Sequence, residues 1–236
     1  MASPGGKRTS RAKAYFEASR TLAASFVFVA PLFALYEVAL AADEGVRSGT
    51  VPLVRELFHP VSHLGLVAFN LVLLGLLCLA IYRTRAQRRR VKGIYGIMFL
   101  EALLWTGIML AVAALVMPRP LKLPPLPRIL LGYVGAGIYE EFLFRFLLLN
   151  GLVLLLHRGL GASRYGSVPL AIVSSALAFS YAHHALGGEA FDHRVFVYRA
   201  LMGAILGAAF CLRGFGIVVY AHALYNVALA LVWRAG

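Results

Sequence analysis

The chain has 236 residues, of which 61% are hydrophobic and 14% charged, and its formal net charge is +13 at pH 7. Soluble domains are about 45–50% apolar and about 25% charged, so this composition excludes a soluble globular fold, a disordered chain and a fibrous repeat. Together with a mean hydropathy of +0.79, it predicts an all-α, polytopic transmembrane helix bundle. The basic residues cluster between apolar runs, which the positive-inside rule explains better than nucleic-acid binding does.

Seven apolar segments are long enough to cross a bilayer, since a spanning helix needs about 20 predominantly apolar residues. They cover residues 21–42, 61–82, 94–117, 129–156, 168–186, 196–212 and 215–233. The first segment follows a basic stretch and could also be a signal peptide. Its length favours a retained helix, because the apolar part of a signal peptide is about 7–15 residues long. We therefore expect a basic N-terminal segment (1–20), three N-terminal spans (21–128) and a C-terminal bundle (129–233).

The charge of the loops predicts the orientation. Placing the N-terminus in the cytoplasm puts 14 lysines and arginines on the cytoplasmic side and eight on the other. Positively charged loops stay inside, so we expect the N-terminal segment 1–20 to be cytoplasmic. A short, basic, alanine- and glycine-rich chain is typical of bacteria, and the expected location is the bacterial inner membrane, with many spans.

The fourth predicted span contains two adjacent acids and an arginine. Ionisable groups inside spans are costly and are functional candidates by default. Glu141 and Arg145 are four residues apart with the acid first, the favourable order for an ion pair on one helical face. Glu140 lies about 100° around the helix, lacks a sequence-local partner and suits a general base acting on water. The alternative is a structural network of both acids with Arg145 and Arg199, for which two adjacent acids are expensive.

The fifth and last spans add two further polar pairs. Phe179 and His183 share a helical face, so the aromatic ring can form a wall of the site in which His183 acts. His222 and Asn226 are also four residues apart, and two such groups aimed at one point suit the stabilisation of an oxyanion. The alternative for this pair is a hydrogen bond that only joins helices, worth about 1 kcal/mol.

Three motifs therefore follow one another on successive spans: Glu140-Glu141-x-x-x-Arg145, Phe179-x-x-x-His183 and His222-x-x-x-Asn226. In this order and spacing they resemble the CPBP (Abi) family, which comprises CAAX prenyl proteases and bacteriocin-processing or immunity enzymes. The resemblance covers about residues 129–232. It implies an intramembrane endopeptidase.

The resemblance also implies a role for each residue. Glu140 would activate the hydrolytic water, which His183 would help to hold, and His222 and Asn226 would form the oxyanion site. The supporting residues would be Glu141 and Arg145, which orient Glu140, and Phe179.

One glutamate and two histidines could also hold zinc with an open position. The lack of an HExxH motif and the poor fit of Asn226 as a ligand favour a mechanism without a metal or other cofactor, with zinc as the alternative. The expected partners are a membrane protein or peptide substrate and the lipid bilayer. The alternative function is a non-catalytic membrane binding or immunity protein that uses the same polar network.

Overall fold

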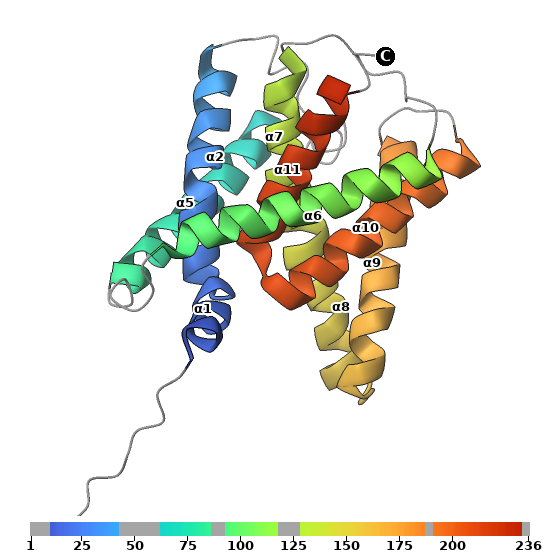
Figure 1. The fold of residues 1–236 in the computed structure, drawn as a ribbon, viewed down its shortest axis with the longest axis horizontal. Helices are drawn as coiled ribbons and strands as arrows, with labels where there is room; N and C mark the ends of the chain where they lie inside the picture. Colours follow the sequence, from blue (N-terminus) through green and yellow to red (C-terminus); the bar gives the residue numbers. More distant parts are fainter. Residues whose placement is uncertain (1–9, 43–61, 86–92, 118–127, 187–190, 233–236) are drawn as a thin grey trace, which may run out of the picture.

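The computed structural model describes residues 10–42, 62–85, 93–117, 128–186 and 191–232, and the regular structure in these ranges is helical throughout, which confirms the all-α prediction. In chain order (Figure 1), the helices are α1 (Arg11–Ser19), α2 (Leu22–Ala42), α5 (Ser62–Arg85), α6 (Ile94–Val116), α7 (Arg128–Glu141), the π-helical η2 (Phe142–Leu149), α8 (Asn150–Leu154), the π-helical η3 (Leu155–Gly159), α9 (Arg164–Leu186), α10 (His193–Arg213) and α11 (Phe215–Val232).

Every apolar segment predicted to span a membrane falls on a helix, and the fourth one is a continuous stretch from α7 through η3. Three helices in the described residues are long and apolar enough to cross a membrane, namely Ile94–Val116, Arg164–Ala185 and His193–Arg213. Helices α1 and α2 meet at a bend of 68°, and counting this pair as one span makes four.

Helices α2, α7 and α11 run side by side, while α6 crosses in front of α11 at a steep angle (Figure 1). On the other side of the molecule α9 packs along α10. The largest apolar core lies between α2, α5, α7 and α11, and its aromatic rings include Phe26, Phe142 and Phe215. Helix α7 thus lies between α2 and α11, and α11 in turn packs against α6 and α10.

Small residues let α7 approach its neighbours closely. A Cβ built at Gly137 would lie 2.9 Å from the backbone nitrogen of Ala223 on α11. A Cβ at Gly135 would lie 2.4 Å from the ring of Tyr36 on α2. Real Cβ atoms do not come so close to other atoms, so a side chain at Gly137 would push α7 away from the helix that carries His222.

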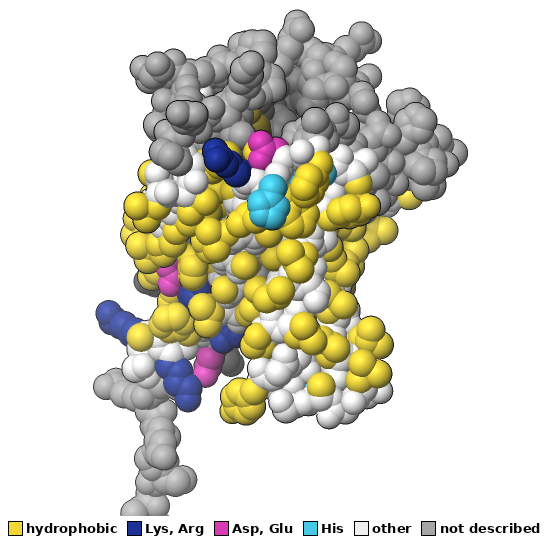
Figure 2. Space-filling view, turned by 90° about the vertical axis from the view of Figure 1, so that its right-hand side faces the viewer, with side chains coloured by type: hydrophobic (Ala, Val, Ile, Leu, Met, Phe, Trp, Pro, Cys, Tyr) yellow, Lys and Arg dark blue, Asp and Glu magenta, His cyan; other side chains and the backbone are white. Residues whose placement is uncertain are grey.

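The outer surface is suited to lipid. Figure 2 shows a face covered mainly by hydrophobic side chains, with most of its lysines and arginines toward the end that carries α1 and a smaller group of charged side chains at the other end. On α6, Leu100, Leu104 and Leu115 are 65%, 64% and 83% exposed. An apolar surface this extensive is stable in contact with acyl chains rather than water.

Candidate active site

Three helices bring Glu140, His183 and His222 together in the interior. Glu140, at the C-terminal end of α7, is only 2% exposed. Its Oε1 lies 3.5 Å from Nε2 of His183 on α9, and its Oε2 lies 3.8 Å from Nε2 of His222 on α11. The carboxylate is therefore flanked by two imidazole nitrogens, each from a different helix.

Both histidine rings are fixed through their Nδ1 atoms. His183 Nδ1 lies 2.9 Å from the carbonyl oxygen of Phe179, and because a carbonyl only accepts, Nδ1 is the donor. His222 Nδ1 lies 2.7 Å from Oε1 of the Glu141 carboxylate, to which it donates. A hydrogen bond at one ring nitrogen sets the orientation of the ring and the role of the other nitrogen. Both Nε2 atoms are thereby directed at Glu140.

The predicted ion pair between Glu141 and Arg145 is present. Arg145 Nη1 lies 3.0 Å from Glu141 Oε1, and both side chains are almost completely buried. Arg145 Nη2 also donates to the carbonyl oxygen of Gly203 on α10, at 3.2 Å. A buried carboxylate without a partner is strongly unfavourable, so this arginine makes it possible for Glu141 to hold His222 inside the bundle.

The helix changes type immediately after Glu141. From Phe142 to Leu149 the chain is π-helical, and Arg145 lies in this stretch. A π-helical turn uses i→i+5 hydrogen bonds, is rare, and is often found at functional sites. The pattern of apolar residues does not distinguish a π-helix from an α-helix, so the sequence contains no signal for it.

Phe179 forms a wall of the site, as predicted. Its ring centroid lies 4.6 Å from that of His183 and 6.2 Å from that of His222. The guanidinium of Arg145 lies 4.6 Å from the centroid of the same ring. The ring therefore packs against both histidines and contributes a cation–π contact to the arginine.

Asn226 is the one predicted site residue that does not join this cluster. It is half-buried on α11, one turn after His222. Within the part of the chain that the structure describes, its amide makes no side-chain hydrogen bond. Its assignment to an oxyanion site stays a prediction from spacing.

The sequence did not predict the contact between Glu141 and His222. These residues are 81 positions apart, and helical spacing says nothing about which helices are neighbours. The same holds for the bond from Arg145 to Gly203, 58 positions away. Glu141 thus has two partners, whereas the spacing of the motif indicated only Arg145.

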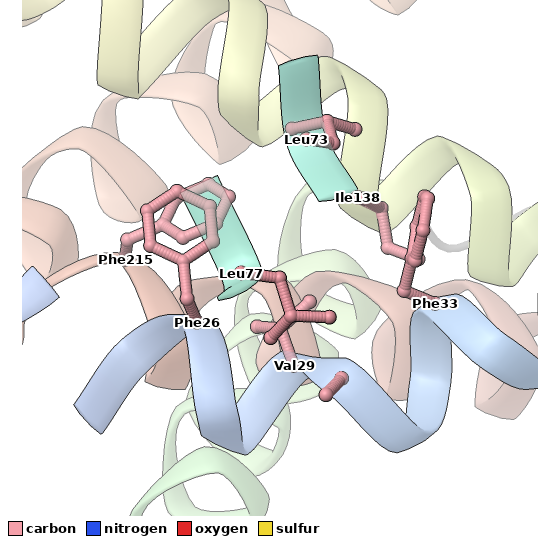
Figure 3. Close-up of a pocket in the computed structure, with 8 residues that line it drawn as sticks. Phe26, Val29, Phe33, Leu73, Leu77, Ile138 and Phe215 are labelled. Atoms are coloured by element: carbon pink, nitrogen blue, oxygen red, sulfur yellow. The ribbon is translucent and has the colours of Figure 1, made fainter. Parts of the chain in front are cut away.

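The described residues also contain an apolar pocket. Figure 3 shows its lining, which is entirely hydrophobic and comes from α2, α5, α7 and α11: Phe26, Val29, Ala30, Phe33, Leu73, Leu77, Ile138 and Phe215. Ile138 precedes Glu140 by two residues, which is about 200° around an α-helix. The pocket and the Glu140 cluster therefore lie on opposite faces of α7.

Comparison with known proteins identifies the part of the chain that carries the site. Residues 122–228 match the family model of Rce1-like proteins, described as type II CAAX prenyl endopeptidase Rce1-like. No curated protein and no solved structure matches the chain. The matched range contains every residue of the three motifs, from Glu140 to Asn226. This segment is thus similar to type II CAAX prenyl endopeptidases of the Rce1-like family, which confirms the resemblance expected from its motifs.

Proposed function

We propose that the protein is an intramembrane endopeptidase that hydrolyses a peptide bond of a membrane-associated protein or peptide, with Glu140 as the base that activates water. The family match supports a peptidase acting on CAAX-type substrates. The observation that carries the proposal is the buried Glu140 carboxylate between the Nε2 atoms of His183 and His222.

The first step is the activation of water. The distances of 3.5 and 3.8 Å are longer than the usual 2.7–3.2 Å of a hydrogen bond, and contacts of this length are commonly bridged by water. Such a water donates one hydrogen to Glu140 and is held by His183 Nε2. Glu140 takes a proton as the water oxygen bonds to the carbonyl carbon. It then returns this proton to the leaving nitrogen as the C–N bond breaks.

The second requirement is stabilisation of the oxyanion. His222 donates through Nδ1 to Glu141, so an N–H at Nε2 requires the doubly protonated ring, for which Glu141 supplies the counter-charge. Asn226, one turn further along α11, supplies an amide N–H. Each such donor is worth about 10²–10³-fold in turnover.

The depth of the site restricts the substrate. We propose seven spans, the N-terminus in the cytoplasm and a location in the bacterial inner membrane. Glu140 then lies about 16 Å along the fourth span, at 1.5 Å per residue, and therefore within the bilayer. A helix hides its peptide bonds, so the substrate has to present an extended segment at this depth.

Glu140→Gln tests the proposal. Cells carry either the native chain or this variant at matched membrane levels, and protein termini are quantified by mass spectrometry. We expect new termini that appear only with the native chain, and Glu17→Gln, which changes an exposed acid on α1, is the matched control. Identical termini with both properly inserted proteins would favour the alternative, a non-catalytic membrane binding or immunity protein.

A zinc-dependent reaction is the chemical alternative. Two imidazoles and a carboxylate are a donor set used by zinc enzymes. However, no group of three or more His, Cys, Asp and Glu side chains in the described ranges is arranged to hold a metal ion, so we derive no step through zinc. Elemental analysis of the purified protein is expected to give well below one zinc per chain. One tightly held zinc per chain would replace the metal-free mechanism.

A further inference from the structure

A second polar cluster lies on the face of α7 that is turned toward α2 and α5. It joins Tyr139 of α7 to Glu37 of α2 and Asn70 of α5, and Tyr139 is only 2% exposed. The Tyr139 hydroxyl lies 2.8 Å from Asn70 Oδ1 and 3.2 Å from Glu37 Oε1. Asn70 Nδ2 donates to the same Glu37 oxygen, at 3.1 Å. Three helices thus meet at one hydroxyl group.

This cluster is directly connected to the candidate base, because Tyr139 is the residue before Glu140. Neighbouring residues of an α-helix are about 100° apart. While Tyr139 faces α2 and α5, Glu140 therefore faces the two histidines. As long as the Tyr139 hydroxyl stays on its two partners, α7 cannot turn about its axis, and the Glu140 carboxylate stays in place.

The contact of α7 at Gly137 sets its rotation less well. At Gly137 the helix touches α11 through backbone and Ala223, without a side chain that interlocks. Such a contact fixes the distance between two helices rather than the rotation of either. Beyond Glu141 the α-helical hydrogen-bond pattern gives way to π-helical turns. Directional hydrogen bonds at Tyr139 therefore constrain the rotation of α7 from the side of α2 and α5, as the hydrogen bond between Glu141 and His222 does from the side of α11.

The rotation matters for the chemistry. A helix with its side chains is about 10–12 Å across, so turning it by about 10° moves a group at its edge by about 1 Å. A displacement of 1 Å can lower a rate by about 10²-fold.

We propose that Tyr139 is a positioning residue: held by Glu37 and Asn70, its hydroxyl sets the rotation of α7 that places Glu140 between His183 and His222. The inference rests on the proposed function. It gives Glu37 and Asn70 a part in catalysis, although neither touches the reacting groups. Both residues lie outside the family-matched range 122–228.

The test compares kcat and KM of variants reconstituted in lipid vesicles, with a quenched fluorescent peptide that ends in a farnesylated CAAX sequence as the probe. Tyr139→Phe removes one oxygen and keeps the ring. We expect kcat to fall about 10–10²-fold and KM to stay within about twofold. The control is Tyr220→Phe on α11, whose ring stacks on Phe28 and whose hydroxyl makes no hydrogen bond among the described residues.

Variants of Glu37 test the positioning role independently, and they are decisive if Tyr139→Phe does not fold. Glu37→Gln keeps an acceptor oxygen and should retain nearly native kcat. Glu37→Leu should lose as much kcat as Tyr139→Phe, and combining the two should add no further loss because they break one network.

Failure of the inference is distinguishable from failure of the proposed function. Glu140→Gln is expected to leave the probe uncut. If the native protein also leaves it uncut, both the proposed function and the positioning role of Tyr139 are contradicted. Cleavage by the native protein together with native kcat in Tyr139→Phe and Glu37→Leu overturns the positioning role alone. Losses that multiply in the double variant also overturn it.

Discussion

The helices from α7 onward and the N-terminal helices bury their polar groups in different ways. In the C-terminal part, polar residues come in pairs one turn apart on the same helix, as with Glu141 and Arg145. In the N-terminal part, two partly buried acids of the described residues each stand alone on their helix and bind a residue far away in the sequence. Glu101 of α6 binds Arg213 of α10, and Glu37 of α2 binds Tyr139 of α7.

The difference separates two tasks. Pairs on one helix are oriented by that helix and can act as a unit in chemistry. Single acids that reach across to another helix instead fix how helices sit against each other, because their hydrogen bonds form only in the assembled bundle. The N-terminal helices thus hold α7 and α10 in place, while the C-terminal helices carry the groups that we propose to react.

The largest expected effect is that of Arg145→Ala in the C-terminal part. It leaves the fully buried Glu141 carboxylate without its cation. The carboxylate that holds His222 is then no longer neutralised by an arginine. We expect the free energy of unfolding to fall by about 3–5 kcal/mol, with loss of folded yield and of cleavage. Thermal unfolding in detergent measures this, with the exposed Arg158→Ala as the matched control. A variant with full activity would contradict the supporting role of Arg145.

Asn226→Ala should affect catalysis alone. Loss of an oxyanion donor is expected to lower kcat about 10²–10³-fold, while the midpoint of thermal unfolding stays native because the amide makes no side-chain hydrogen bond in the described ranges. Asn150→Ala, which removes an exposed amide that donates to the Phe146 carbonyl, is the control. Equal kcat in the two variants would remove Asn226 from the site.

Glu101→Leu tests the structural role assigned to the N-terminal helices. Its carboxylate accepts from Arg213 Nε at 2.8 Å and from Nη2 at 3.1 Å. Hydrogen bonds to charged groups contribute about 1.5–3 kcal/mol each, and Glu101 is partly exposed, so we expect about 2 kcal/mol less stability. The kcat of the folded fraction should not change.

The comparison for Glu101→Leu is Glu17→Leu, which breaks an exposed ion pair 4.0 Å long. Its effect on unfolding should be no more than about 0.5 kcal/mol. If Glu101→Leu lowered kcat as strongly as Asn226→Ala, the separation of tasks between the two parts would be wrong.

Sequence alone predicted helices over the apolar segments and the polar pairs within them, but not the helix α1 in the basic N-terminal segment. Apolar runs of about 20 residues indicate helices whatever they pack against, and residues four apart share a face. It could not predict which helices are neighbours: Glu37 and Tyr139 are 102 positions apart, and Glu101 and Arg213 are 112. Each of these acids is a costly residue in an apolar segment, but the local sequence contains no signal for its partner.

The cluster around Glu140 was half predictable for the same reason. The motif order indicated that Glu140, His183 and His222 belong to one site, and the structure brings them together. The second partner of Glu141 depended on a helix contact that spacing does not show. The roles of these residues and of Asn226 stay predictions that the experiments above address.

The π-helical turns after Glu141 also determine how the directions of the later side chains respond to a change in chain length. A π turn holds one more residue than an α turn, and the stretch from Phe142 to Leu149 is accommodated in that form. Deleting a single residue there would remove the extra residue of one π turn and let that turn relax to an α turn, so the later residues of the same helix would keep their directions. A deletion in the α-helical part of α7 would instead turn every later residue by about 100°. The π-helical stretch is thus the part of this helix where the chain can shorten by one residue without redirecting the side chains that follow.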